Sequence, residues 1–261
     1  MKEIYNLYCA DCIEKLKDFP ENTFDMIFAD PPYMLSNGGI SCHNGRVVSV
    51  NKGDWDESKG LKEDFEFHKK WLEACRWVLK QNGTLWVSGT YHSIYQCGFA
   101  MQVLGYHILN DISWFKPNAS PNMSCRYFTA SHETLIWARK DKAYRHYFNY
   151  DLMKNGDYPK DFIKKPNAQM RSVWAIGTPT PKEKVFGKHP TQKPVELLER
   201  IILASTKEND LILDPFMGSG TTGVVAMKLG RQFVGIEKNP KFIALADRRI
   251  FDAYQHKENK E

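Results

Sequence analysis

The sequence predicts an α/β fold, with a mostly parallel sheet and helices on both of its faces, in one domain spanning residues 1–261. Short apolar runs at 26–29 and 211–213 each end in a polar loop, which is typical of buried parallel strands. In the last third of the chain, strands and helices alternate around a glycine loop, and such alternation indicates a parallel sheet. A chain of 261 residues with 42% hydrophobic content can bury the core that this fold requires.

The first half of the chain contains one strongly periodic helix, expected at 63–80. Its apolar residues recur at three- and four-residue spacing, and they are Phe67, Trp71, Ala74, Cys75 and Val78. Asn82-Gly83 is expected to end this helix, and the run 84–88 is expected to form the next strand. The other elements expected before residue 140 are a helix at 91–104 and strands at 108–115 and 134–138.

Two segments lack regular periodicity. The stretch 36–56 is polar and rich in glycine, and its length makes it a candidate mobile loop over a site. Four prolines interrupt 140–188, where we expect an irregular region. Alternation returns at Pro194, which suits the first turn of a helix. The elements expected from there are helices at 194–204, 221–229 and 240–254 and strands at 211–213 and 232–236.

The net charge of +5 is concentrated in one segment. Residues 115–188 hold 14 Lys+Arg and 6 Asp+Glu, a local charge of +8, whereas the remaining 22 basic and 25 acidic residues sum to −3. The same segment contains 12 of the 34 aromatic residues. Basic and aromatic side chains interleaved in this way suit a polyanion with stackable bases. A solvated charged face over a small aromatic core would give the same composition.

Composition disfavours a membrane protein and a metal site. No apolar run approaches the roughly 18 residues of a membrane span, and the N-terminus lacks a signal-peptide pattern, so we expect a cytoplasmic location. The six cysteines include one C-x-x-C pair, Cys9 and Cys12. No second pair or histidine cluster follows at metal spacing, so packed thiols are expected.

A glycine loop between a strand and a helix, Gly218-Ser219-Gly220, is a candidate cofactor site. Glycines let a ligand approach the backbone, and a helix N-terminus favours negative charge. The next strand ends at Glu237, 17 residues past Gly220, where a carboxylate can accept both ribose hydroxyl hydrogens. This predicts an adenosine cofactor. The loop by itself leaves NAD and S-adenosylmethionine both open, because G-S-G-T-T-G fits the dinucleotide template only loosely.

The tetrapeptide Asp30-Pro31-Pro32-Tyr33 follows the strand at 26–29 and is a candidate catalytic loop. An exocyclic amino group on a base is a poor nucleophile until both N–H bonds find acceptors. The Asp30 carboxylate and the Pro31 carbonyl can supply them, and consecutive prolines stiffen the loop that holds them. Tyr33 can stack on a base taken out of the helix. The alternative is a polar turn capped by an aromatic residue.

The two loops together resemble the beta class of DNA amino-methyltransferases, in which D-P-P-Y precedes F-x-G-x-G. The resemblance rests on Asp30-Pro31-Pro32-Tyr33, on 214–222, on 187–194 (G-K-H-P-T-Q-K-P) and on Asp11-Cys12. It implies a circularly permuted Rossmann-like fold that binds S-adenosyl-L-methionine. It also implies catalytic roles for the D-P-P-Y residues and cofactor contacts for Asp11, Cys12, Asp30, Thr191, Lys193, Asp214, Phe216, Gly218, Ser219, Gly220, Thr221, Thr222 and Glu237.

Further segments resemble the GATC adenine methyltransferases of the DpnA kind. They are 36–41 (S-N-G-G-I-S), 47–50 (V-V-S-V), 52–56 (K-G-D-W-D), 122–128 (N-M-S-C-R-Y-F) and 146–154 (H-Y-F-N-Y-D-L-M-K). This similarity implies N6-methylation of a flipped adenine in GATC, in double-stranded DNA with tolerance of single strands. It also implies a restriction–modification setting with a cognate restriction endonuclease, and a chain that can form a homodimer.

The basic range 115–188 is expected to be the target-recognition region that contacts DNA. Its expected DNA contacts are Lys116, Arg126, Tyr127, Arg139, Lys164, Lys165 and Arg171. Two alternatives to adenine methylation stay open. Cytosine N4 is the same kind of amine, although Ser in place of Asp30 is the more usual N4 form in the family. A DNA-binding protein with an inactive cofactor fold is the non-enzyme alternative.

Overall fold

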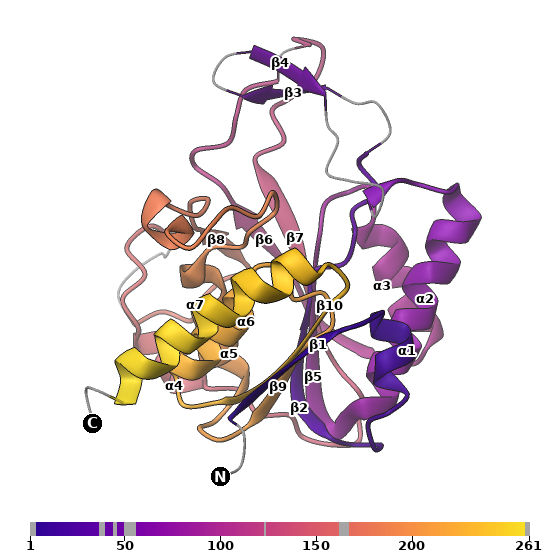
Figure 1. Cartoon of the computed structure of the whole chain (residues 1–261), viewed down its shortest axis with the longest axis vertical. Helices are drawn as coiled ribbons and strands as arrows, with labels where there is room; N and C mark the ends of the chain where they lie inside the picture. The colour runs from indigo at the N-terminus through magenta and orange to yellow at the C-terminus, as the bar shows by residue number, and fades with distance from the viewer. Residues whose placement is uncertain are drawn as a thin grey trace.

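The computed structural model describes residues 4–36, 40–43, 46–49, 56–122, 124–161 and 167–258, and these residues form an α/β fold around an eight-stranded sheet (Figure 1). The strand order is β1-β10-β9-β2-β5-β7-β6-β8. In that order the strands are Tyr5–Cys9, Gln232–Glu237, Leu211–Asp214, Phe24–Ala29, Leu79–Gly89, His132–Arg139, His107–Phe115 and Val173–Ala175. Only β7 runs antiparallel to its neighbours, which confirms the mostly parallel sheet.

Helices cover both faces of this sheet (Figure 1). One layer holds α1 (Cys12–Leu16), α2 (Leu61–Val78) and α3 (Ile94–Val103), and the other holds α4 (Tyr150–Asn155), α5 (Val195–Ser205), α6 (Thr221–Lys228) and α7 (Pro240–Glu258). A short antiparallel hairpin of β3 (Ile40–His43) and β4 (Arg46–Ser49) lies apart from the sheet, at the top of Figure 1. None of the helices in the described ranges is long and apolar enough to cross a membrane.

The apolar run of β2 shows why the central strands read as continuous hydrophobic segments. Met26 and Phe28 pack in the core beneath α5, α6 and α7, whereas Ile27 and Ala29 pack in the core beneath α1, α2 and α3. Successive side chains of a strand point to opposite faces, and here both faces are covered. Every position of the strand except Asp25 is therefore buried and apolar.

The strand order places the ends of β9 and β2 side by side. Ile27 pairs with Leu213 in parallel register, so Asp30 and Asp214 follow neighbouring strands at the same edge of the sheet. The chain departs from these two strands toward opposite sides, since α6 follows β9 on one face and α2 follows β2 on the other. Open α/β sheets bind ligands at such a switch point, outside the carboxyl ends of the strands.

The predicted boundary between α2 and β5 was wrong. The helix ends at Val78, Leu79 begins the strand, and Asn82-Gly83 lies inside β5. The reason is a bulge: Leu79 pairs with Phe24 and Thr84 pairs with Met26, so β5 carries extra residues between two pairings with β2. Pro194 is the N-cap of α5, just before the expected first turn. The short elements β1 and α1 were not predicted.

The range 115–188 is divided between the sheet and its loops. Strand β7 is inserted between β5 and β6, and β8 extends the sheet edge beside β6. The irregular region expected at 140–188 therefore contains β8, α4 and a 3₁₀ turn at Pro181–Lys184. The parts of this range outside the sheet are the candidates for target recognition. The range 36–56, predicted as a loop, contains the hairpin of β3 and β4, and its residues 37–39, 44–45 and 50–55 lie outside the described residues.

Candidate active site

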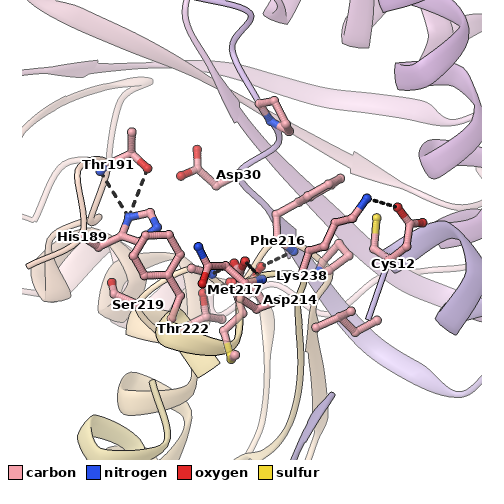
Figure 2. A pocket seen from close by; sticks show the side chains of 18 of the residues that line it. Cys12, Asp30, His189, Thr191, Asp214, Phe216, Met217, Ser219, Thr222 and Lys238 are labelled. Atoms are coloured by element: carbon pink, nitrogen blue, oxygen red, sulfur yellow. Dashed lines mark hydrogen bonds and ion pairs between the residues drawn. The ribbon is translucent and has the colours of Figure 1, made fainter. Parts of the chain in front are cut away.

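A cavity of about 790 Å³ opens at the carboxyl ends of β1, β10, β9 and β2. Its walls contain both loops that the sequence singled out, because Asp30 and Pro32 line it together with Asp214 and residues 215–219. Figure 2 shows Cys12 and Lys238 at one end of the cavity and His189 and Thr191 at the other, with Asp30 between them. The fold therefore joins the candidate catalytic loop and the candidate cofactor loop in one site.

Of the expected cofactor residues, all but Gly220 line this cavity. The lining residues among them are Asp11, Cys12, Asp30, Thr191, Lys193, Asp214, Phe216, Gly218, Ser219, Thr221, Thr222 and Glu237. Gly220 instead begins α6 with φ of 76°, and a Cβ there would lie 2.8 Å from the Cβ of Ala246 in α7. Its conformation and its helix contact explain this glycine, and its contact with the cofactor stays a prediction.

The glycine loop is organised by two carboxylates. Asp214 accepts hydrogen bonds from the Phe216 amide at 3.0 Å and from the Thr222 hydroxyl at 2.6 Å. Burial raises the pKa of Asp214 to about 7, against the lowering effect of these two bonds. Glu237 accepts the Gly218 amide at 3.0 Å, so the loop between the strands is tied to the end of β10.

The far end of the cavity carries acceptors for hydroxyl or amino groups. Glu237 closes β10 and also accepts the Asn239 amide at 2.7 Å, and burial raises its pKa. On the neighbouring strand β1, Cys9 pairs with Glu237, and Asp11 follows as the N-cap of α1. Lys238 lies 3.5 Å from the Asp11 carboxylate. Two carboxylates at adjacent strand ends suit the ribose and base of an adenosine.

The loop of Asp30 is held by a carboxylate that sequence reasoning missed. Asp56 is 1% exposed and accepts hydrogen bonds from the backbone amides of Tyr33, Met34 and Leu35 at 2.8, 2.9 and 3.2 Å. It therefore satisfies three donors of a turn in which Met34 has φ of 58°. Asp56 belongs to the segment 52–56 that carries the resemblance, but no local pattern showed that it binds this turn, because its partners lie more than 20 residues earlier in the chain.

Asp30 sits in a buried network of ionic and polar groups. Lys193 donates to one of its carboxylate oxygens at 2.6 Å, and the Tyr33 hydroxyl donates to the other at 2.7 Å. Burial raises the pKa of Asp30 although Lys193 lowers it. The same ammonium lies 3.6 Å from Glu133, which was not predicted as a site residue. Lysine and carboxylates of this kind form a site for proton chemistry.

Tyr33 is more enclosed than a stacking role suggests. Its side chain is 6% exposed, and its hydroxyl also contacts Ser88 at 2.9 Å and Glu133 at 2.8 Å. Pro32 lines the cavity, whereas Pro31 and Tyr33 are not among its lining residues. Stacking of Tyr33 on a base stays a prediction. The structure gives its hydroxyl a place in the network around Asp30.

The expected DNA contacts fall into different environments. Arg126 and Tyr127 are exposed on the 116–131 loop, beside Phe128, which is 98% exposed. This loop joins β6 to β7 at the edge where Asp30 lies, and it projects beyond the sheet in Figure 1. Arg171 is exposed just before β8. Lys164 and Lys165 lie outside the described residues.

Two of these residues lie in settings that do not favour a contact with DNA. Lys116 is paired with the Glu133 carboxylate, so its charge is directed into the protein. Arg139 ends β7 opposite Thr84, at the edge of the sheet away from Asp30, and it donates to the Tyr144 carbonyl at 3.3 Å. The reason in both cases is the antiparallel course of β7, which brings its first residues to the site and its last residue to the opposite edge.

Comparison with known proteins gives close relatives over almost the whole chain. The family model described as DNA methylase (N6_N4_Mtase) matches residues 24–248. The chain is 53% identical to the Type II methyltransferase M2.LlaDCHI of Lactococcus lactis subsp. cremoris, covering 95% of this chain and 90% of that relative. It is 54% identical to the Type II methyltransferase M2.DpnII of Streptococcus pneumoniae, covering 92% and 87%.

Solved structures share the fold. The M1.HpyAVI–SAM complex matches with a TM-score of 0.68 and 28% identity, covering 94% of this chain and 98% of that one. The PvuII DNA methyltransferase, which is cytosine-N4-specific, matches with a TM-score of 0.70 and 21% identity, covering 98% and 93%. The second likeness concerns the fold alone. Both match more than nine tenths of this chain, which agrees with a Rossmann-like sheet.

Proposed function

Because the chain belongs to the N6/N4 DNA methylase family, we propose that it transfers a methyl group from S-adenosylmethionine to N6 of a flipped adenine in DNA, within GATC. One observation carries the proposal: the Asp30 carboxylate and the glycine loop of 214–222 line the same cavity. Transfer from a cofactor to an amine requires that the two bind within reach of each other. The relatives named Type II methyltransferases support the restriction–modification setting and the choice of GATC.

The cavity fits S-adenosylmethionine by its donor set. Asp11 and Glu237 lie at the neighbouring ends of β1 and β10 and would hold the adenosine. Lys193 contacts Asp30, and Figure 2 shows Thr191 on the far side of Asp30 from Cys12 and Lys238. When bound, S-adenosylmethionine supplies an electrophilic methyl group on a sulfonium sulfur. The carboxylates of Asp30 and Asp214 at the strand ends give this part of the cavity acceptors and partial negative charge, which suit a sulfonium.

Asp30 accepts one hydrogen of the adenine amino group and so keeps the nitrogen lone pair directed at the methyl group. The carbonyl of Pro31 is the second acceptor. The Asp56 carboxylate fixes the loop through Tyr33, Met34 and Leu35, so these acceptors are positioned before the substrate enters. Flipping is required because N6 of adenine is engaged in pairing within a duplex.

The proposal is tested by measuring the transfer of tritiated methyl groups from S-adenosylmethionine to DNA duplexes with and without GATC. Asp30→Ala should lose transfer while calorimetry shows that the cofactor still binds. Asp18→Asn, on an exposed side chain, is the matched control and should be fully active. Nucleoside analysis separates the products: N6-methyladenine supports the proposal, whereas N4-methylcytosine would establish the alternative target. An active Asp30→Ala enzyme refutes the mechanism.

The same proposal includes the DNA contacts, the form of the DNA substrate and the cellular setting of the reaction. The chain acts as a single methyltransferase domain whose 116–131 loop, with Arg126 and Tyr127, contacts the target DNA. Double-stranded DNA is the main substrate and single strands are accepted. The protein works in the bacterial cytoplasm as a homodimer and protects DNA from a cognate restriction endonuclease. Sequencing of methylated bases in a plasmid, after expression in a methylation-free host, tests the site.

A further inference from the structure

Behind Asp30, a buried network extends sideways along the carboxyl edge of the sheet. Asp30 and Tyr33 follow β2, Ser88 lies near the end of β5, Glu133 lies near the start of β7, and Lys116 follows β6. These four strands are consecutive neighbours in the sheet. Only Asp30 of these five residues lines the cavity. The other four therefore act on a substrate through Asp30 or have a structural role.

The Tyr33 hydroxyl lies between two carboxyl groups and a serine hydroxyl. Its oxygen lies 2.7 Å from Asp30, 2.8 Å from Glu133 and 2.9 Å from Ser88. Tyr33 has one hydroxyl hydrogen, which it can direct to Asp30 or to Glu133, and Ser88 can donate to Tyr33 or, at 3.4 Å, to Glu133. A proton added to this network would be carried by one of the two carboxyl groups.

The charges decide which carboxyl group takes that proton. Glu133 is flanked by Lys116 and Lys193, which hold its pKa to about 2 although burial opposes this. Glu133 therefore stays ionised and accepts the Tyr33 hydroxyl hydrogen. With its hydrogen directed to Glu133, the Tyr33 oxygen can accept a hydrogen from Asp30, whose pKa is raised by burial and by the negative charge of Glu133.

We propose that Glu133 is a positioning residue that, through the Tyr33 hydroxyl, prepares Asp30 to take up the proton released by methyl transfer. Before transfer, Tyr33 donates to the Asp30 carboxylate. After transfer, Asp30 carries the proton and donates to Tyr33, which has turned its own hydrogen to Glu133. The inference rests on the proposed function, because it assigns a fate to the proton of that reaction.

The step is balanced in atoms and charge. The bond between sulfur and the methyl carbon breaks and its electron pair stays on sulfur, while the amine lone pair forms the new nitrogen–carbon bond. The nitrogen then carries a positive charge. One N–H bond breaks, its electron pair returns to nitrogen, and the proton forms an O–H bond on Asp30. The products are a neutral thioether, a neutral secondary amine and a protonated Asp30.

The test is the pH profile of methyl transfer under single-turnover conditions, because rate depends on ionised Asp30. The groups that face Asp30 are Lys193, Tyr33, Glu133 and, from the neighbouring strand, Asp214. Glu133→Gln removes a negative charge, so the acid limb should move to lower pH and the plateau rate should fall about tenfold or more. Lys116→Met should move the acid limb in the opposite direction, to higher pH.

Tyr33→Phe and the double variant with Glu133→Gln test the path of the effect. If Glu133 acts through the Tyr33 hydroxyl, the double variant should be no slower than the slower single variant. Effects that multiply would overturn the proposal. So would acid limbs that do not move in Glu133→Gln and Lys116→Met. Glu73→Gln, on the exposed face of α2, is the control for removing a carboxylate and should match the unaltered protein.

Two further measurements distinguish a failure of this inference from misfolding of a variant and from a failure of the proposed function. Calorimetry of each variant with S-adenosylmethionine should give binding within about twofold of the unaltered protein, which shows an intact site. Glu133→Asp keeps a carboxylate and should recover part of the plateau rate. If the unaltered protein transfers no methyl to DNA at any pH, the proposed function fails. If it is active and the limbs stay in place, only the role of Glu133 fails.

Discussion

Replacement of Lys193 by methionine removes the cation that compensates two buried carboxylates. The ammonium is 7% exposed and lies 2.6 Å from Asp30 and 3.6 Å from Glu133. At 2.6 Å, the attraction is about 6 kcal/mol for an effective dielectric constant of about 20. Desolvation of the lysine opposes this, and breaking a buried pair by removing one partner costs about 3–5 kcal/mol. Lys193→Met should therefore lower the melting temperature by roughly 6–20 °C at pH 7.

The same change should alter the pH dependence in a defined direction. Without Lys193 the pKa of Asp30 rises further, so the ionised fraction at neutral pH falls and the acid limb of methyl transfer moves to higher pH. A raised pKa in the folded state means that stability is lost as pH increases, so the deficit should be smaller at pH 5 than at pH 8. Thermal unfolding and single-turnover transfer from pH 5 to 9 measure both effects.

The control is Lys70→Met, on an exposed position of α2, which should change neither quantity. A Lys193→Met protein whose rate profile superimposes on that of the unaltered protein would refute the reasoning. In that case the charge of Lys193 would have no part in setting the ionisation of Asp30.

Three further predictions concern stability. Gly220→Ala should lower the unfolding free energy by about 1–3 kcal/mol in urea, because φ is 76° and the new Cβ would meet Ala246 at 2.8 Å. Asp161→Asn should lower it by about 3–5 kcal/mol, because Asp161 and Arg200 pair at 2.6 Å with both side chains 3% exposed. Asp214 has a pKa raised to about 7, so stability should fall as pH rises from 4 to 7, and Asp214→Asn should reduce that slope.

Each of these three stability predictions can be contradicted by a measurable outcome. The exposed pair of Lys160 and Glu196 is the control for the buried one, and Glu196→Gln should cost less than about 1 kcal/mol. Equal losses in Asp161→Asn and Glu196→Gln would show that burial does not decide the effect. A Gly220→Ala protein as stable as the unaltered one would show that α7 can shift to accommodate the new Cβ. If the pH dependence of stability is unchanged in Asp214→Asn, a group other than Asp214 takes up the proton.

The resemblance to amino-methyltransferases, read from the motifs alone, is confirmed by the family match and by the relatives. The motifs suffice because each is local: a strand, the loop after it and the helix that follows are contiguous in sequence. The strands at 26–29 and 211–213 were found because burial on both faces makes every position apolar. Their loops then had to lie at the carboxyl edge, where ligands bind.

Charged residues were less predictable, because the partner of a charge is fixed by the neighbours of its strand. Lys116 looked like a phosphate contact in a basic segment, and the structure pairs it with Glu133. Arg139 belongs to the same segment, and the direction of β7 carries it away from the site. The composition of a segment gives the number of its charged residues, but it does not predict the direction of each side chain.

The sequence by itself determined the α/β class and the two loops, and 12 of the 13 cofactor residues that it predicted line the cavity. Only the tertiary structure decided that Tyr33, Ser88, Glu133 and Lys116 meet behind Asp30. These residues come from four strands that are neighbours in space and spread over 101 positions, from 33 to 133, of the chain. Their meeting depends on the strand order and on one antiparallel strand, which no local pattern of residues encodes.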